Sequence, residues 1–193
     1  MKRIILDLCG GTGSWSKPYK DAGYDVRLIT LPEYDVRTYE PPENVYGILA
    51  SPPCTEFSLA KTTVPRNLVK GFEIVKACLE IIYFCRMNRK FKFWALENPF
   101  GLLRQFLGKP PLTFDPCDYG DPYTKKTDLW GYFNFPKQNK VKLTQEIKER
   151  CSINKRHLPK LPNGYRPPDG NLLSAQRAIT PPGFAKAFFN SNK

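Results

Sequence analysis

Short apolar runs along this chain predict its strands. Polar turns and amphipathic stretches separate these runs. Each run is short, is rich in Ile, Leu and Val, and is followed by glycine, proline or polar residues. Runs of this length, closed by turn residues, are typical of buried strands. The predicted strands are 3–8, 25–30, 45–51 and 91–98.

Helices are predicted between and after these strands. The main one covers about 66–89, where apolar residues recur at steps of three and four along one face. A shorter helix follows the first strand and runs through about residue 22, and two prolines open a last helix at 181–191. This alternation predicts an α/β, Rossmann-like fold, with a mostly parallel sheet covered by helices on both faces.

The residues that could bind a ligand or take part in a reaction lie at the predicted strand ends. Gly10, Gly11 and Gly13 follow the first strand, Cys54 follows the third, and Glu97 ends the fourth. Ligands of such sheets bind beyond the carboxyl ends of the strands. We therefore expect these residues to share one rim of the sheet.

The amino-acid composition favours a polyanionic partner. The 193 residues include 30 Lys and Arg against 18 Asp and Glu, a formal charge of +12. An excess of this size favours nucleic acid, although a merely basic soluble protein remains the alternative. The chain length suits one domain, and residues 136–170 form a basic, proline-rich excursion with little periodicity.

The six cysteines form no CxxC pair, which indicates a reduced, intracellular protein rather than a disulfide scaffold. Cys117, Cys151 and His157 match no standard zinc spacing, so we expect no metal. No apolar run approaches the roughly 18–20 residues of a membrane span. The run near the N-terminus is also too brief for a signal peptide, so no membrane partner is expected.

Residues 7–13, "DLCGGTG", form a glycine-rich turn between a strand and a helix. Glycines let the backbone approach a ligand closely, and a helix N-terminus favours negative groups. The turn lacks the GK[ST] ending of a phosphate loop and the spacing of the dinucleotide fingerprint. A tight structural turn is the alternative.

Residues 51–54, "SPPC", hold one thiol in a stiffened frame at a strand end. A thiolate is a good nucleophile when its position and surroundings are fixed. Most free cysteines are simply small buried hydrophobic residues. The flanking prolines and the polar Thr55 and Glu56 favour the nucleophile here.

Residues 96–99, "LENP", place a carboxylate at the end of an apolar strand. Burying Glu97 there is costly unless it is paired or catalytic. The alternative is a glutamate that accepts backbone hydrogen bonds within a turn.

Together, and in this order, the motifs resemble those of the cytosine-5 DNA methyltransferases, particularly the short phage- and prophage-type members. "DLCGGTGSWS" is similar to their cofactor loop, "SPPCTEFS" to their nucleophile motif and "ENP" to their ENV motif. "YGDPYTKKTDLWG" at 119–131 resembles the next motif, and "RAITPPGFAKAFF" at 177–189 resembles the last, which packs beside the first. The resemblance spans nearly the whole chain.

The resemblance implies S-adenosyl-L-methionine as cofactor. Cys9 replaces the usual Phe of the loop, and Glu33 is the carboxylate nearest to the expected ribose-binding position. Asp35 matches the residue that contacts the adenine amino group. The implied cofactor-binding residues are Asp7, Leu8, Cys9, Gly10, Gly11, Thr12, Gly13, Trp15, Glu33, Asp35, Val36, Pro52 and Thr180.

The resemblance also implies the catalytic residues. Cys54 would attack cytosine C6, and Glu97 would hydrogen-bond N3 and the exocyclic amine. Tyr123, Lys125 and Thr127 stand where the larger family has Gln-x-Arg-x-Arg, so Lys125 would act as a point charge in place of an arginine fork. The implied substrate-binding residues are Ser51, Pro53, Phe57, Ser58, Asn98 and Lys126.

The expected function is methylation of cytosine C5 in DNA through a covalent adduct of Cys54. The resemblance implies one catalytic domain over 1–193, with a short basic target-recognition insertion at about 132–176. Its partner would be DNA, with no obligate protein partner, in the cytoplasm of a prokaryotic or phage-infected cell, associated with the nucleoid.

Two alternatives stay open: methylation of RNA or another acceptor, and an inactive DNA-binding protein on the same fold. Cys54 disfavours an amino-methylating enzyme, whose motif has an aromatic residue at that position.

Overall fold

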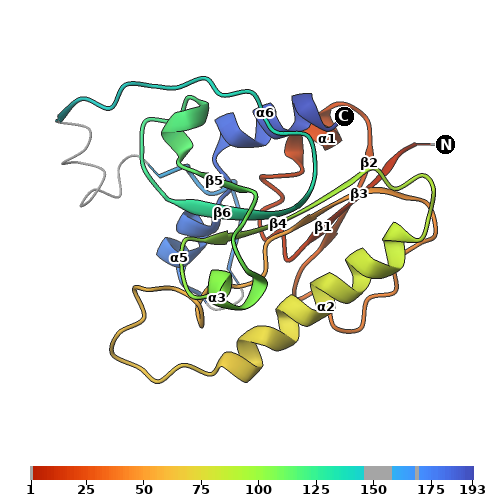
Figure 1. The fold of residues 1–193 in the computed structure, drawn as a ribbon, viewed down its shortest axis with the longest axis horizontal. Helices are drawn as coiled ribbons and strands as arrows, with labels where there is room; N and C mark the ends of the chain where they lie inside the picture. The colour runs from red at the N-terminus through yellow and green to blue at the C-terminus, as the bar shows by residue number, and fades with distance from the viewer. Residues whose placement is uncertain (1, 146–157, 168–169) are drawn as a thin grey trace.

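A computed structural model describes residues 2–145, 158–167 and 170–193, and its centre is a six-stranded sheet (Figure 1). The strands lie in the order β2-β1-β3-β4-β6-β5. The pairs β1–β2, β1–β3 and β3–β4 are parallel, whereas β6 pairs antiparallel with β4 and with β5. The strands are β1 (Ile4–Leu8), β2 (Asp25–Ile29), β3 (Val45–Ala50), β4 (Phe93–Pro99), β5 (Leu112–Phe114) and β6 (Thr127–Tyr132).

Helices cover both faces of this sheet. The long helix α2 crosses one face, and α1 and α6 lie together on the other (Figure 1). The short α3 and the 3-10 helix η1 flank β5 in the sequence, and α5 precedes α6. The helices are α1 (Lys17–Asp21), α2 (Leu68–Arg86), α3 (Leu103–Leu107), η1 (Pro116–Tyr119), α5 (Leu172–Ala178) and α6 (Pro182–Ser191).

Alternating side chains of the central strands build one core on each face of the sheet. Leu6 and Leu8 pack with Cys78 of α2, whereas Ile5 packs with Trp15 and Phe188 on the opposite face. Strands that are buried on both faces read as continuous apolar runs, which is why the sequence predicts β1, β3 and β4. The predicted α/β fold, with a mostly parallel sheet between helices, is confirmed.

The observed bounds differ from the predicted ones mainly at the antiparallel edge. α2 lies inside the predicted 66–89, and α6 begins one residue later than expected. The sequence pattern does not predict β5, β6 or α5. Within the described ranges, no helix combines the length and the apolar composition that crossing a membrane requires.

Candidate active site

Three loops that carry the sequence motifs meet at the carboxyl ends of β1, β3 and β4. The sheet order places β3 between β1 and β4, so their ends are neighbours. Beyond the strands, the Ser51 backbone N–H still donates to the Leu8 carbonyl at 2.9 Å. The rim that the sequence predicts for the glycines, Cys54 and Glu97 is therefore present.

The loop after β1 turns sharply through backbone conformations that favour glycine. Gly11 and Gly13 have φ values of 53° and 68°, and Cys9 has a φ of 56°, which is rare for a residue with a side chain. The Cys9 backbone N–H donates to the Ile29 carbonyl at 2.8 Å, which holds the loop to β2. The Cys9 sulfur lies 4.0 Å from that of Cys78 in α2. The loop thus presents backbone rather than side chains, and Thr12 is half-buried within it.

Asp7 is a fully buried carboxylate beneath this loop. Ser16 Oγ donates to its Oδ2 at 2.5 Å, while Oδ1 finds no hydrogen-bond partner among the described residues. Burial raises the pKa of Asp7 to about 7, against the opposing effect of the Ser16 hydrogen bonds. A Cβ on Gly10 would lie 2.3 Å from Asp7 Cγ, so only glycine fits above this carboxyl group.

The last sequence motif lies against the first. The Thr180 backbone N–H donates to Ser14 Oγ at 2.9 Å, and Thr180 is nearly buried. Trp15 is buried, with its ring 6.0 Å from Phe184 and 5.5 Å from Phe188 of α6. Trp15 therefore helps to anchor the glycine loop on α6, and its predicted contact with a cofactor remains a prediction.

The predicted cofactor-binding residues after β2 differ in their surroundings. Glu33 is exposed, and Val36 is buried in the core. Arg37 Nε donates to both carboxylate oxygens of Asp35, at 2.9 and 3.0 Å. This pairing lowers the pKa of Asp35 to about 2. Asp35 is therefore ionised at neutral pH, and a ligand there would share its carboxylate with Arg37.

Cys54 lies in a tight turn directly after β3. Its carbonyl accepts backbone hydrogen bonds from Phe57 at 3.0 Å and from Ser58 at 2.8 Å. Pro52 before it is buried, Pro53 is exposed, and the cysteine itself is half-buried. The turn therefore fixes the backbone of Cys54 at the rim of the sheet.

Three hydrogen-bonded contacts join the Cys54 loop to the end of β4. Asn98 Nδ2 donates to the Pro52 carbonyl at 2.9 Å, and Ser58 forms an antiparallel bridge with Gly101. The Leu102 backbone N–H donates to the Phe57 carbonyl at 2.9 Å. A Cβ on Gly101 would lie 2.4 Å from that carbonyl oxygen, so the close approach requires glycine. The two motifs are thereby held in a fixed relation.

Glu97, Cys54 and Lys125 interact electrostatically. Burial raises the pKa of Glu97, and the nearby Lys125 opposes this rise. Burial and then the Glu97 charge raise the pKa of Cys54, again against Lys125. Glu97 Oε2 is buried and finds no hydrogen-bond partner among the residues described. The site therefore joins a thiol, a carboxyl group and one cation.

The predicted substrate-binding residues divide into two groups. Ser51 and Ser58 are half-buried at the rim, and Lys126 is exposed with Nζ 5.2 Å from the Phe100 ring centroid. Phe57 is fully buried, with its ring 5.1 Å from that of Phe72. Asn98 is 1% exposed. These last two side chains lie within the fold, so substrate contact by them remains a prediction.

The sequence does not predict the ion pair between the buried Asp128 and the half-buried Arg104. Asp128 of β6 lies opposite Asn98 in the register of β4, and it is fully buried. Arg104 donates to both its oxygens at 2.9 and 2.7 Å, and Thr113 Oγ1 adds a bond of 2.7 Å. An aspartate within the apolar run "TDLWG" signals a buried partner, although the sequence does not say which one.

A second missed contact lies above the glycine loop. The Tyr165 hydroxyl lies 3.8 Å from the position of a Cβ on Gly11. Tyr165 belongs to the predicted insertion, and no sequence signal points to this contact. Residues 146–157 of that segment, with Cys151 and His157 among them, lie outside the described residues.

Comparisons with known proteins give similarity to solved structures alone. No protein-family model and no curated protein matches the chain. The methyltransferase EhMeth of Entamoeba histolytica aligns with a TM-score of 0.44 and 12% identity, over 77% of this chain and 58% of that chain. A mutant of Spodoptera frugiperda DNMT2 aligns with a TM-score of 0.42 and 15% identity, over 74% and 55%. This chain thus spans little more than half the length of either protein, and the likeness concerns the fold.

Proposed function

We propose that the protein is an S-adenosylmethionine-dependent methyltransferase that modifies cytosine C5 in DNA, as a short member of the cytosine-5 family. One observation carries this proposal. Cys54 of the nucleophile motif and Glu97 of the ENV-like motif lie at one rim of the sheet. The Glu97 charge raises the pKa of Cys54, and the Lys125 charge lowers the pKa of both groups. The Asn98–Pro52 hydrogen bond links the loops that carry them.

The glycine loop fits the proposed cofactor. Asp7 Oδ1 is a buried acceptor without a partner among the described residues, and Gly11 and Gly13 have no side chains that would keep a ligand from the backbone. Thr180 and Tyr165 would border the bound molecule on the side of the last motif and the insertion. S-adenosylmethionine, when bound, supplies an electrophilic methyl group.

The residues of the chain would activate the cytosine ring. Cys54 Sγ forms a bond to C6 while electrons of the C5=C6 double bond move toward C5 and N3. Glu97, whose pKa is raised by burial, can hold a proton and donate it to N3. Its other oxygen can accept from the exocyclic amine. Once C5 carries the methyl group, a base takes the C5 proton, the C5=C6 double bond forms again, and Cys54 Sγ leaves C6 as the thiolate, while N3 returns its proton to Glu97.

The raised pKa of Cys54 has a consequence for this scheme. The resting thiol keeps its proton at neutral pH, so the thiolate must form when substrate binds. Lys125 is the cation that opposes the rise, and it takes the place of an arginine in the larger family. A lysine point charge near both groups can stabilise the thiolate without a planar fork.

Analysis of the methylated product tests the proposed function. The protein is incubated with S-adenosylmethionine carrying a deuterated methyl group and with either cytosine-containing DNA or RNA. The nucleic acid is then digested to nucleosides for mass spectrometry. We expect labelled 5-methyl-2′-deoxycytidine from the DNA. Label found only in RNA would show that RNA, not DNA, is the substrate. No label in either nucleic acid would contradict the proposal.

A further inference from the structure

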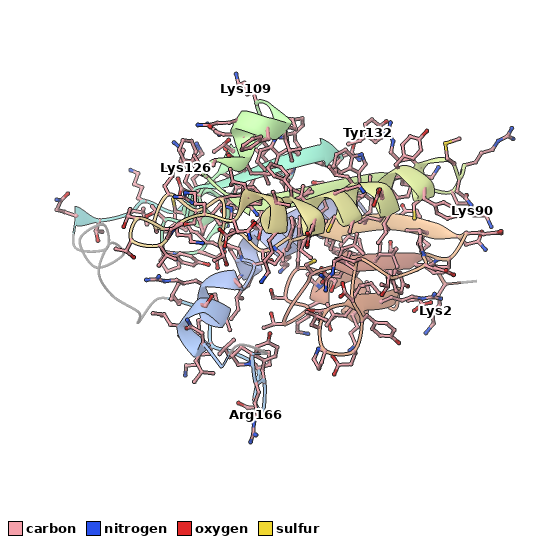
Figure 2. The ribbon with its side chains drawn as sticks, turned by 90° about the horizontal axis from the view of Figure 1, so that it is seen from below. Lys2, Lys90, Lys109, Lys126, Tyr132 and Arg166 are labelled. Carbon is pink, nitrogen blue, oxygen red and sulfur yellow. The ribbon has the colours of Figure 1, made fainter. Side chains whose placement is uncertain are left out.

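A basic pocket lies at the amino ends of the central strands, away from the rim that carries Cys54. It has a volume of about 930 Å³. Figure 2 shows Lys2 and Lys90 at one end of the molecule and Lys126, beside the candidate active site, toward the other. Its lining residues are Lys2, Arg3, Ile4, Lys20, Tyr24, Asp25, Val26, Asn44, Tyr46 and Lys90.

Four cations from three segments of the chain line this pocket without carboxylate partners. Lys2 and Arg3 precede β1, Lys20 belongs to α1, and Lys90 precedes β4. Among the residues that the structure describes, no carboxylate pairs with any of the four. The one acid of the lining, Asp25, lies 3.1 Å from Arg27 and is thereby already paired. The pocket thus has an uncompensated positive charge, which favours an anion.

Tyrosine rings hold the Arg3 side chain in place. The Arg3 guanidinium carbon lies 4.8 Å from the Tyr46 ring centroid, and Nη1 donates to the Tyr24 hydroxyl at 3.2 Å. Tyr24 and Tyr46 are themselves 6.1 Å apart and pack on Phe189 and Phe93. A guanidinium plane fixed on an aromatic ring can stack a nucleobase or form paired hydrogen bonds with phosphate.

We propose that this pocket binds a nucleotide unit, with its phosphate between the lysines and its base against Arg3. The volume is ample for one nucleotide, and the half-buried Ile4 and Val26 add apolar side chains to the lining. The unit can be a free mononucleotide or one residue of a nucleic-acid strand, since both carry a phosphate ester beside a planar base. The inference stands independently of the proposed methyl transfer.

Chemical-shift mapping on the isotopically labelled protein tests the pocket directly. The probes are thymidine 5′-monophosphate, a thymidine tetranucleotide, thymidine and inorganic phosphate. Thymidine compounds are chosen because they contain neither adenine nor a cytosine for the other rim. We expect the two phosphorylated thymidine probes to shift the amides of residues 3, 4, 24–26 and 46, and thymidine or phosphate alone to shift them far less.

Preferential binding of the tetranucleotide would identify a strand as the ligand, and preference for the monophosphate would identify a free nucleotide. Shifts confined to other regions of the chain would overturn the proposal.

Variants provide the matched comparison. Joint replacement of Lys2, Lys20 and Lys90 by alanine should weaken binding of the preferred probe about tenfold or more at low salt. The control replaces the exposed Lys70, Lys109 and Lys186, which removes the same charge elsewhere, and should change affinity less than about twofold. Arg3→Gln tests the stacking role and should weaken thymidine 5′-monophosphate more than inorganic phosphate. Equal losses in the two triple variants would show binding by net charge and contradict a pocket.

Discussion

The titratable groups of the candidate active site, at the carboxyl ends of the parallel strands, are buried or half-buried, whereas the cations at the amino ends are exposed. At the carboxyl ends, burial raises the pKa of Asp7, Cys54 and Glu97, so these groups tend to hold their protons. At the amino ends, the cations Lys2 and Lys90 are exposed and line the basic pocket. One end therefore offers groups that can change protonation during a reaction, and the other offers a fixed charge for attraction.

This difference shows how a strongly basic protein can hold half-buried thiol and carboxyl groups with raised pKa values at its candidate active site. Removing a thiol and a carboxyl group from water costs stability, and this cost is typical of sites that use perturbed groups. Exposed lysines cost little folding stability, and they attract anions over a distance of about a Debye length.

Replacing Cys54 by serine should remove the covalent step. We expect methyl transfer to fall by about 10⁴-fold or more, because a hydroxyl is a far weaker nucleophile than a thiolate. Calorimetry should show S-adenosylmethionine binding nearly unchanged, since the glycine loop is a separate segment. The matched control is Cys117→Ser, at another half-buried cysteine, which should retain activity. Substantial turnover by Cys54→Ser would exclude the covalent mechanism.

Replacing Glu97 by glutamine should slow chemistry much more than it weakens binding. Loss of one positioned acid typically costs about 10²–10⁴-fold in rate. Single-turnover rates and DNA affinity, measured on the same variant, separate the two effects. If rate and affinity fell by the same factor, Glu97 would be a structural residue rather than a catalytic one.

Asp7 should make the protein less stable as the pH rises. Its pKa is about 7 in the folded state against 3.8 ordinarily, so the folded state holds a proton that the unfolded chain releases between these values. The contribution of Asp7 to the free energy of unfolding should therefore fall by about 3 kcal/mol from about pH 5 to about pH 8.

Denaturant titrations of wild type and Asp7→Asn at both pH values measure this difference. The amide that replaces the carboxyl group cannot titrate, so the variant should lack this part of the pH dependence. Identical pH dependence in the two proteins would place the Asp7 carboxyl in a more solvated setting than the structure shows.

Lys125 should set the pH at which the thiolate forms. Removing its charge by Lys125→Ala should move the ascending limb of the pH–rate profile toward higher pH, because the charge lowers the pKa of Cys54. Lys125→Arg keeps the charge and should restore most of the wild-type profile. A slower Lys125→Ala enzyme with an unmoved limb would assign the lysine to substrate binding instead.

The sequence predicts the central strands well and the antiparallel edge poorly, for physical reasons. β1, β3 and β4 are apolar runs because helices cover both of their faces. β5 has three residues, too few to show any periodicity, and β6 interrupts its apolar run with Asp128. The partner of Asp128, Arg104, lies far away in the sequence, and no local pattern identifies such a pair.

The candidate site shows the same limit. Strand ends and residue types were sufficient to place Cys54 and Glu97 at one rim. Asn98 is predicted to bind substrate, and the sequence gives no sign that its Nδ2 donates to the Pro52 carbonyl across two loops. The contact between Tyr165 and the glycine loop depends on the path of a segment without periodicity. Long-range contacts therefore decide which residues of a motif face a ligand and which of them hold the loops together.

The most direct test of the central claim is mass spectrometry of the protein after reaction with DNA that contains 5-fluorocytosine. In the presence of S-adenosylmethionine, fluorine at C5 prevents the proton loss that releases the enzyme, so Cys54 should remain bonded to C6. The account predicts a stable wild-type adduct, with the modified peptide containing Cys54 and no adduct for Cys54→Ser. An enzyme that methylates ordinary cytosine yet forms no adduct, or forms one at another residue, would contradict it.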